Sequence, residues 1–189
     1  AKFWASSYEE KRPELTTAQR KMLSHYDNAT LYNDSIVTQI VKRFQKENAI
    51  VIYVPDHGEE CYEEDRGFIC RNHAANIDWP LAHYEFEIPF WIYCSPKYIK
   101  THRDIYRQIR AAKDKRFMTD ALPHLLLYLA GIETPTYKEE YNILSPKYNE
   151  MRPRILKNSA DYDQLRDEHL KKVEKEKSKK EKSKKGDKK

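Results

Sequence analysis

An aspartate and a histidine stand side by side where an apolar segment ends, and this pair is the strongest chemical signal in the chain. Residues 50–59 read IVIYVPDHGE, so Asp56 and His57 follow a run rich in isoleucine and valine. Carboxylate oxygens and imidazole nitrogens are typical ligands of zinc-type divalent cations, and open α/β sheets bind ligands at the carboxyl ends of their strands. The pattern predicts a metal site at Asp56 and His57. The alternative is an ordinary strand-to-loop turn, in which Asp and Gly serve the backbone geometry.

A long helix and two strands are expected to position this pair. The helix is predicted over residues 16–46, capped by Thr16 or Thr17. Its apolar face is expected to be core and holds Met22, Tyr26, Ala29, Ile36, Ile40, Val41 and Phe44. Residues 49–54 form a continuous apolar run, which suits a strand covered on both faces. Residues 87–94 favour a second strand, with Pro89 at its edge or start.

The segment between the two strands is predicted to be a long polar loop over residues 55–81. It carries His57, His73, Cys61, Cys70 and five acidic residues from Glu59 to Asp65. Long loops inside compact domains are often functional. Within this loop Glu59 is the candidate that orients the His57 ring, and the alternative is a solvated acid.

Further helices are expected over residues 95–113 and 121–130, the latter capped by Thr119 or Asp120 and ended by Gly131. Residues 141–144 are strand-like. The order helix, strand, loop, strand, helix, helix predicts a layered α/β fold.

The charge of the chain is concentrated in its last segment. Residues 171–189 hold eleven lysines and four acidic residues, a net charge of +7. Because the whole chain of 189 residues carries +5, the remainder carries −2. We expect a folded part over residues 1–155 and a charged, disordered tail over residues 156–189, because a lysine-rich tail has almost nothing apolar to bury. Such a tail can contact nucleic acid or an anionic membrane, but we favour a solvated terminus and predict no nucleic-acid partner.

Composition bounds the class of protein. The sequence holds no run of about 18 apolar residues, and its first residues are not those we expect of a signal peptide. The chain opens with AKFW and no initiator Met, which we expect of a piece of a longer protein. Cys61 and Cys70 are close enough in sequence to form a disulfide, and unpaired thiols are equally compatible with the sequence. Motifs of the GxSxG, GxGxxG and P-loop types are absent, so nothing supports nucleotide binding.

Several segments together resemble the carboxyl-terminal half of the phosphoethanolamine transferases, in the sulfatase branch of the alkaline phosphatase superfamily. They are residues 26–34 (YDNATLYND), 52–60 (IYVPDHGEE), 68–73 (FICRNH), 87–92 (EIPFWI), 120–126 (DALPHLL) and 129–132 (LAGI). The resemblance implies a layered α/β/α, alkaline-phosphatase-like sheet, of which only the carboxyl-terminal part is present.

The resemblance also implies a function. Such enzymes move phosphoethanolamine from phosphatidylethanolamine to a lipid A or lipopolysaccharide sugar through a phospho-threonine. They are anchored in the bacterial inner membrane, with the catalytic domain in the periplasm. Asp56 and His57 match the family's zinc ligands, and His73 matches a residue that contacts the transferred group or a second zinc.

The match is incomplete, because the family's nucleophilic Thr, a further acidic zinc ligand, an upstream His and the membrane helices lie in an amino-terminal half. We therefore expect half an active site, with no catalytic nucleophile in this chain and no turnover by the chain alone. Two alternatives stay open. One is a sulfatase or phosphodiesterase of the same superfamily, and the other is a non-catalytic half-domain with a binding or assembly role.

Overall fold

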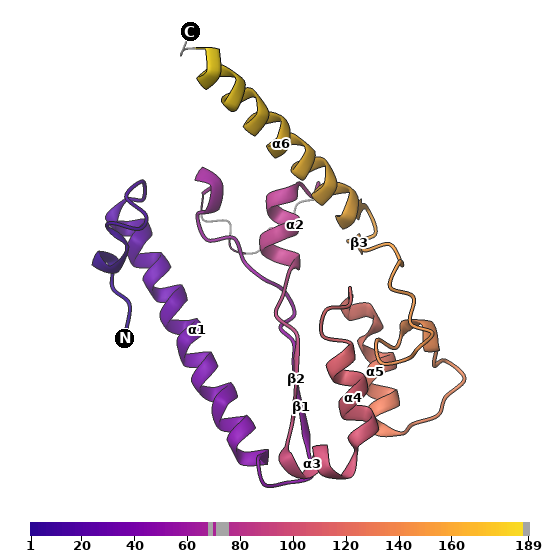
Figure 1. The fold of residues 1–189 in the computed structure, drawn as a ribbon. Helices are drawn as coiled ribbons and strands as arrows, with labels where there is room; N and C mark the ends of the chain where they lie inside the picture. The colour runs from indigo at the N-terminus through magenta and orange to yellow at the C-terminus, as the bar shows by residue number, and fades with distance from the viewer. Residues whose placement is uncertain (68–69, 71–75, 187–189) are drawn as a thin grey trace. The chain divides into compact units, whose positions relative to one another are not determined.

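The chain folds into two compact units in the computed structural model, which describes residues 1–67, 70 and 76–186 (Figure 1). Unit 1 comprises the described parts of residues 1–55, 61–70 and 89–110. Unit 2 comprises the described parts of residues 56–60, 71–88 and 111–189. The predicted metal-binding pair begins unit 2, directly after a strand of unit 1.

The long helix of unit 1, α1 (Thr17–Phe44), confirms the first predicted helix. Thr16 and Gln19 form a reciprocal cap: the Gln19 amide donates to Thr16 Oγ1 at 3.3 Å, and the Thr16 amide donates to Gln19 Oε1 at 2.8 Å. The short 3-10 helix η1 (Ala5–Tyr8) packs against α1. The resulting core contains Tyr8, Leu15, Leu23, Cys61 and Tyr62.

Strands β1 (Ile50–Tyr53) and β2 (Trp91–Cys94) form a two-stranded antiparallel ladder (Figure 1). Ile50 pairs with Cys94, and the rings of Tyr53 and Trp91 stack with centroids 5.2 Å apart. Both strands are shorter than predicted, and β2 begins after Pro89, whose ring removes a backbone donor. All four residues of β1 are only half-buried, so the prediction of a strand covered on both faces is wrong for this chain.

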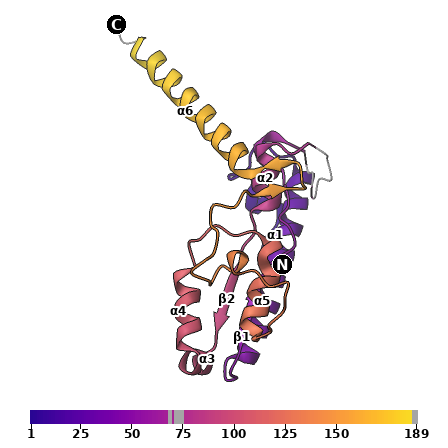
Figure 2. The ribbon, with the colours of Figure 1, turned by 90° about the vertical axis from the view of Figure 1, so that its right-hand side faces the viewer.

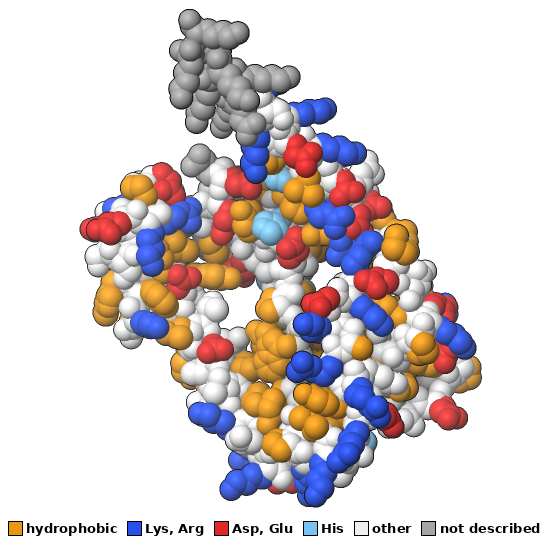
Figure 3. Space-filling view, viewed as in Figure 1, with side chains coloured by type: hydrophobic (Ala, Val, Ile, Leu, Met, Phe, Trp, Pro, Cys, Tyr) orange, Lys and Arg blue, Asp and Glu red, His pale blue; other side chains and the backbone are white. Residues whose placement is uncertain are grey.

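The carboxyl-terminal half of α1 exposes apolar side chains that were expected in the core. Ile36, Ile40 and Phe44 are 38%, 45% and 40% exposed. Apolar side chains also reach the surface over β1 and β2 (Figure 3). A two-stranded sheet offers too little surface to bury a long helix, because isolated two-stranded ladders are themselves marginal. This apolar surface of unit 1 therefore needs a further layer.

The predicted helix over residues 95–113 is divided into α3 (Pro96–Thr101) and α4 (Arg103–Ala111). The division falls at His102, which has φ −128° and ψ 52°. Ser95 caps α3, since its Oγ accepts the Tyr98 amide at 3.1 Å, and the same hydroxyl donates to the Glu47 carbonyl at 2.6 Å. This serine ties α3 to the segment that precedes β1.

Unit 2 contains a helix that the sequence analysis missed, α2 (Trp79–Phe86), within and beyond the predicted loop. Helix α5 (Leu122–Ala130) ends as predicted at Gly131, which has φ 66°. Its predicted cap is wrong, because the 3-10 helix η3 (Thr119–Ala121) precedes it and Arg152 binds both carboxylate oxygens of Asp120 at 2.6 Å. Residues 141–144 form no strand; Tyr141 ends the 3-10 helix η4 (Glu139–Tyr141), and residues 142–144 follow as a buried turn.

The carboxyl-terminal segment is ordered from its beginning. Strands β3 (Ile155–Leu156) and β4 (Ala160–Asp161) form a hairpin that leads into α6 (Tyr162–Gly186). Leu156 and Tyr162 are buried, and the first turns of α6 lie beside α2 (Figure 2). The prediction of a disordered tail from residue 156 onward is thus wrong for the hairpin and for the first turns of α6. None of the helices in the described residues is both long and apolar enough to span a lipid bilayer.

Candidate metal centre

The turn after β1 brings the side chains of Asp56 and His57 together. Asp56 Oδ1 accepts the backbone N–H of His57 at 3.1 Å, which fixes the carboxylate. Its other oxygen, Oδ2, lies 3.5 Å from His57 Nε2. The Asp56 side chain is 85% exposed and the His57 side chain 24% exposed, so an ion can reach both atoms.

The tautomer of His57 follows from its other ring nitrogen. Nδ1 lies 2.8 Å from the carbonyl oxygen of Gly58, which can only accept, so Nδ1 carries a proton. In the neutral ring the lone pair is then on Nε2, the nitrogen nearer Asp56 Oδ2. Two ligands about 2.1 Å from a tetrahedral zinc ion lie about 3.4 Å apart. The spacing and the tautomer both fit zinc. The Gly58 carbonyl orients the ring here, and the orienting role expected of Glu59 stays a prediction.

The pair alone does not complete a zinc site. Over residues 1–67, 70 and 76–186, no group of three or more His, Cys, Asp or Glu side chains is arranged to hold a metal ion. The predicted substrate-binding residue His73 lies outside the described residues. Since a catalytic zinc normally has about three protein ligands, Asp56 and His57 form part of a site at most.

Helix α2 holds the turn that carries the candidate metal ligands, and it does so through Gly58. The Gly58 amide donates to the Glu85 carbonyl at 2.8 Å. A Cβ at position 58 would lie 2.2 Å from the Tyr84 carbonyl oxygen, so only glycine permits this approach. The last turn of α2 therefore positions the pair. The sequence signal for α2 was present, because Asp78 caps it, accepting the Leu81 amide at 3.0 Å, and Pro80 occupies its first turn.

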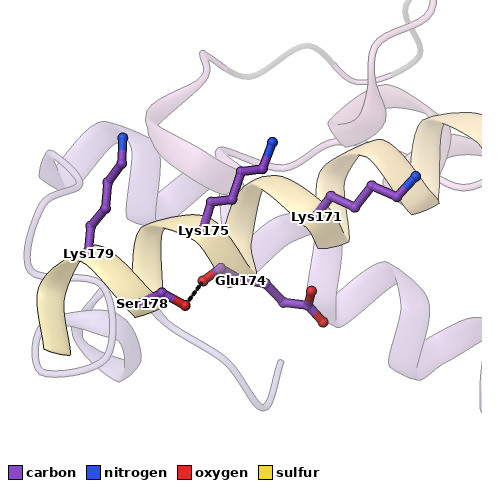
Figure 4. Close-up of a pocket in the computed structure, with 5 residues that line it drawn as sticks. All are labelled: Lys171, Glu174, Lys175, Ser178 and Lys179. Atoms are coloured by element: carbon purple, nitrogen blue, oxygen red, sulfur yellow. Dashed lines mark hydrogen bonds between the residues drawn. The ribbon is translucent and has the colours of Figure 1, made fainter. Parts of the chain in front are cut away.

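The three cysteines are thiols in the described part of the chain. A shallow hollow elsewhere in unit 2 lies on α6 and is lined by Lys171, Glu174, Lys175, Ser178 and Lys179 (Figure 4). Its lysines point to one side of the helix and Glu174 to the other, while Ser178 Oγ donates to the Glu174 carbonyl at 2.9 Å. This hollow contains none of the predicted site residues and reads as a solvated helix surface.

Comparison with known proteins shows the family and the relatives of this chain. Residues 2–132 match the sulfatase family model. The chain is 31% identical over 141 residues to the phosphoethanolamine transferase EptC of Escherichia coli, and 27% identical over 99 residues to the Kdo(2)-lipid A phosphoethanolamine 7''-transferase of the same species. These matches cover 73% and 51% of this chain. They span only 23% and 16% of the two relatives, so the chain corresponds to a small part of each.

The fold has solved relatives as well. The carboxyl-terminal periplasmic domain of Escherichia coli EptC, also solved as a complex with zinc, matches with a TM-score of 0.60 and 28% identity. The match covers 80% of this chain and 43% of the solved domain. The corresponding domain of Campylobacter jejuni EptC matches with a TM-score of 0.52 and 22% identity, covering 69% of this chain and 40% of that domain. These matches confirm the predicted fold class and its partial character.

Proposed function

Because the chain belongs to the sulfatase family, we propose that it is the carboxyl-terminal part of the catalytic domain of a zinc-dependent phosphoethanolamine transferase. The donor would be phosphatidylethanolamine and the acceptor a lipid A or lipopolysaccharide sugar. The full protein would be anchored in the inner membrane with this domain in the periplasm. Support comes from the relatives, which are phosphoethanolamine transferases, one of them solved as a periplasmic domain with zinc.

One observation carries the proposal: Asp56 Oδ2 and His57 Nε2 lie 3.5 Å apart, with the imidazole tautomer set by Gly58. Zinc bound there would neutralise charge on the phosphoryl oxygens and lower the pKa of an attacking hydroxyl. The role of this chain is to hold and orient that ion. His73 is the proposed contact for the transferred group. The nucleophilic threonine and the remaining ligands would come from the part of the domain outside this chain.

The apolar surface of unit 1 supports the same proposal. The exposed side chains of Ile36, Ile40 and Phe44 and the half-buried ladder of β1 and β2 lack a covering layer in the described residues. This chain spans only 43% of the solved periplasmic domain of EptC. We propose that the rest of the domain packs on this surface.

The test uses the full-length protein. We expect Asp56→Ala and His57→Ala each to abolish phosphoethanolamine transfer and to lower zinc content, because each removes a ligand. His73→Ala should impair transfer and keep the first zinc. His25→Ala, at an exposed position of α1, is the matched control and should leave both unchanged. Wild-type turnover and full zinc content in the Asp56 and His57 variants would refute the metal site.

The same assay separates the alternatives. A phosphatidylethanolamine-like donor reports transfer, whereas aryl sulfate and phosphodiester substrates report the sulfatase and phosphodiesterase activities of the superfamily. The isolated chain should bind zinc weakly and turn over none of these substrates. Turnover by the isolated chain would place the nucleophile within it. A full-length protein with no turnover on any substrate would favour the binding or assembly role.

A further inference from the structure

A small apolar core joins α2 to the carboxyl-terminal segment. Ala82 of α2 is fully buried, and it packs with Leu156 of β3 and Tyr162 of α6. We name the set the α2–α6 cluster; its members are Ile77, Trp79, Ala82, Phe86, Leu156, Tyr162 and Leu165. All belong to unit 2, as does the Asp56–His57 turn. The back of α2 is therefore covered by residues that follow position 154.

Aromatic stacking extends this core along α6. The Trp79 ring stacks on His83 of its own helix, with centroids 5.5 Å apart, and on His169 of α6, with centroids 5.2 Å apart. Tyr162 meets the same ring at 5.7 Å in a tilted arrangement. Histidine side chains are visible where α2 meets the first turns of α6 (Figure 3). Tyr162 and His169 are seven residues apart, so Trp79 packs against one face of α6 over its first two turns.

A polar contact closes the cluster at the carboxyl end of α2. Glu87, the residue that ends α2, accepts a hydrogen bond from the Tyr162 hydroxyl and lies 2.9 Å from His83 Nδ1. Burial and the bond to Glu87 raise the pKa of Tyr162 to about 12. Burial opposes the charged form of Glu87, yet the hydrogen bond from Tyr162 and the nearby His83 ring hold the pKa of that carboxyl below its usual value. Both shifts indicate a contact made between a neutral hydroxyl and a carboxylate.

The start of α6 is held in place independently. Asp161 Oδ1 accepts the amides of Asp163 and Gln164 at 2.8 and 3.2 Å and so caps the helix. Asp163 pairs with Arg154 at 2.6 Å and also with Arg116. Tyr162 therefore reaches α2 from a fixed helix terminus and not from a loose tail.

The cluster lies next to the contact that positions the metal-binding turn. Gly58 donates to the carbonyl of Glu85, which lies two residues before Glu87 and three after Ala82. We propose that the first turns of α6 hold the carboxyl-terminal turn of α2 in place under Gly58, with Tyr162 as a positioning residue for the zinc ligands Asp56 and His57. This inference rests on the metal site of the proposed function. It adds the start of α6 to the segments that support the site, and α6 lies beyond the family match, which ends at residue 132.

The experiment measures zinc affinity of the full-length protein by competition with a chromophoric chelator. We expect Tyr162→Ala to raise the zinc Kd about tenfold, the lower end of the range for groups that orient metal ligands. Tyr162→Phe keeps the ring and should stay within about threefold of wild type. Leu125→Ala is the matched control: Leu125 is fully buried in α5 of the same unit, so the change should lower the thermal midpoint without changing the zinc Kd.

Hydrogen exchange of the Gly58 amide provides a second measurement. Loss of the cluster should speed this exchange in Tyr162→Ala and leave it unchanged in Leu125→Ala. If Tyr162→Ala does not fold, Leu165→Ala removes a smaller contact from the same helix and should raise the zinc Kd about threefold.

The outcomes distinguish a failure of the metal site from a failure of the positioning role of Tyr162. A wild-type protein that binds no zinc overturns the metal site itself. A wild-type protein that binds zinc, together with a folded Tyr162→Ala variant of equal zinc Kd and equal Gly58 exchange, overturns only the positioning role. An equal loss of zinc affinity in Leu125→Ala also overturns it, because the effect would then follow from general destabilisation.

Discussion

Replacing Gly58 by alanine tests the arrangement of the candidate metal centre most directly. The added methyl carbon would lie 2.2 Å from the Tyr84 carbonyl oxygen and 3.2 Å from its carbonyl carbon. These are backbone atoms in the last turn of α2, so relief requires the turn and the helix to separate by about 1 Å. Overpacking of this kind costs about 1–3 kcal/mol. Loss of the Gly58 to Glu85 hydrogen bond adds about 1–3 kcal/mol if the groups stay unpaired.

Against these costs stands a gain of about 0.4–1 kcal/mol, because alanine has less freedom than glycine in the unfolded chain. We therefore expect Gly58→Ala to destabilise the protein by about 2–4 kcal/mol and to weaken zinc binding about tenfold or more. Denaturant unfolding and chelator competition on the full-length protein measure the two effects. Gly67→Ala is the control, since no atom lies within 4 Å of a Cβ built there. A Gly58→Ala variant with wild-type stability and zinc affinity would refute the role of α2 as a support for the turn.

Three further predictions concern the carboxyl-terminal half. Gly131→Ala should cost about 1 kcal/mol in denaturant unfolding, because φ is +66° while nothing obstructs the methyl group; an unchanged stability would contradict this. Deleting residues 171–189 should move the thermal midpoint by less than about 2 °C, because Val173 is their one apolar residue, and a larger drop would mean that the tail docks. The raised pKa of Tyr162 stabilises the fold fully below about pH 10, and this contribution is lost as the pH rises toward about 12. A pH series of thermal midpoints should therefore fall more steeply in this window for wild type than for Tyr162→Phe.

Local signals in the sequence were sufficient for many elements. The Thr16 cap and its Gln19 partner begin α1, Ser95 and Pro96 begin α3, and Gly131 ends α5. Each of these depends on contacts within a few residues, which composition and spacing reveal. The sequence analysis missed α2, although Asp78 and Pro80 signal its start. It missed this helix because the polar and acidic residues before α2 favour one continuous loop.

Burial was harder to foresee, since it depends on what the rest of the chain provides. Ile36 and Phe44 follow the pattern of a core face, yet they are exposed because two short strands cannot cover α1. Tyr162 precedes a lysine-rich segment whose composition predicts disorder. Its side chain is nevertheless buried, because the hairpin of β3 and β4 brings it against α2. Side-chain type alone cannot distinguish these two outcomes.

The sequence by itself identified the family and predicted the chemistry of the candidate site. Adjacent Asp56 and His57 after an apolar strand indicate a metal ligand pair, and the matching segments identify the family from their order. Only the tertiary structure decided how the pair is held: the 3.5 Å spacing, the proton on Nδ1 and the approach of Gly58 to α2. The physical reason is that the turn is held by the Glu85 carbonyl of α2, 27 residues from Gly58 along the chain. The position of α2 follows from packing and not from any sequence preference within the turn.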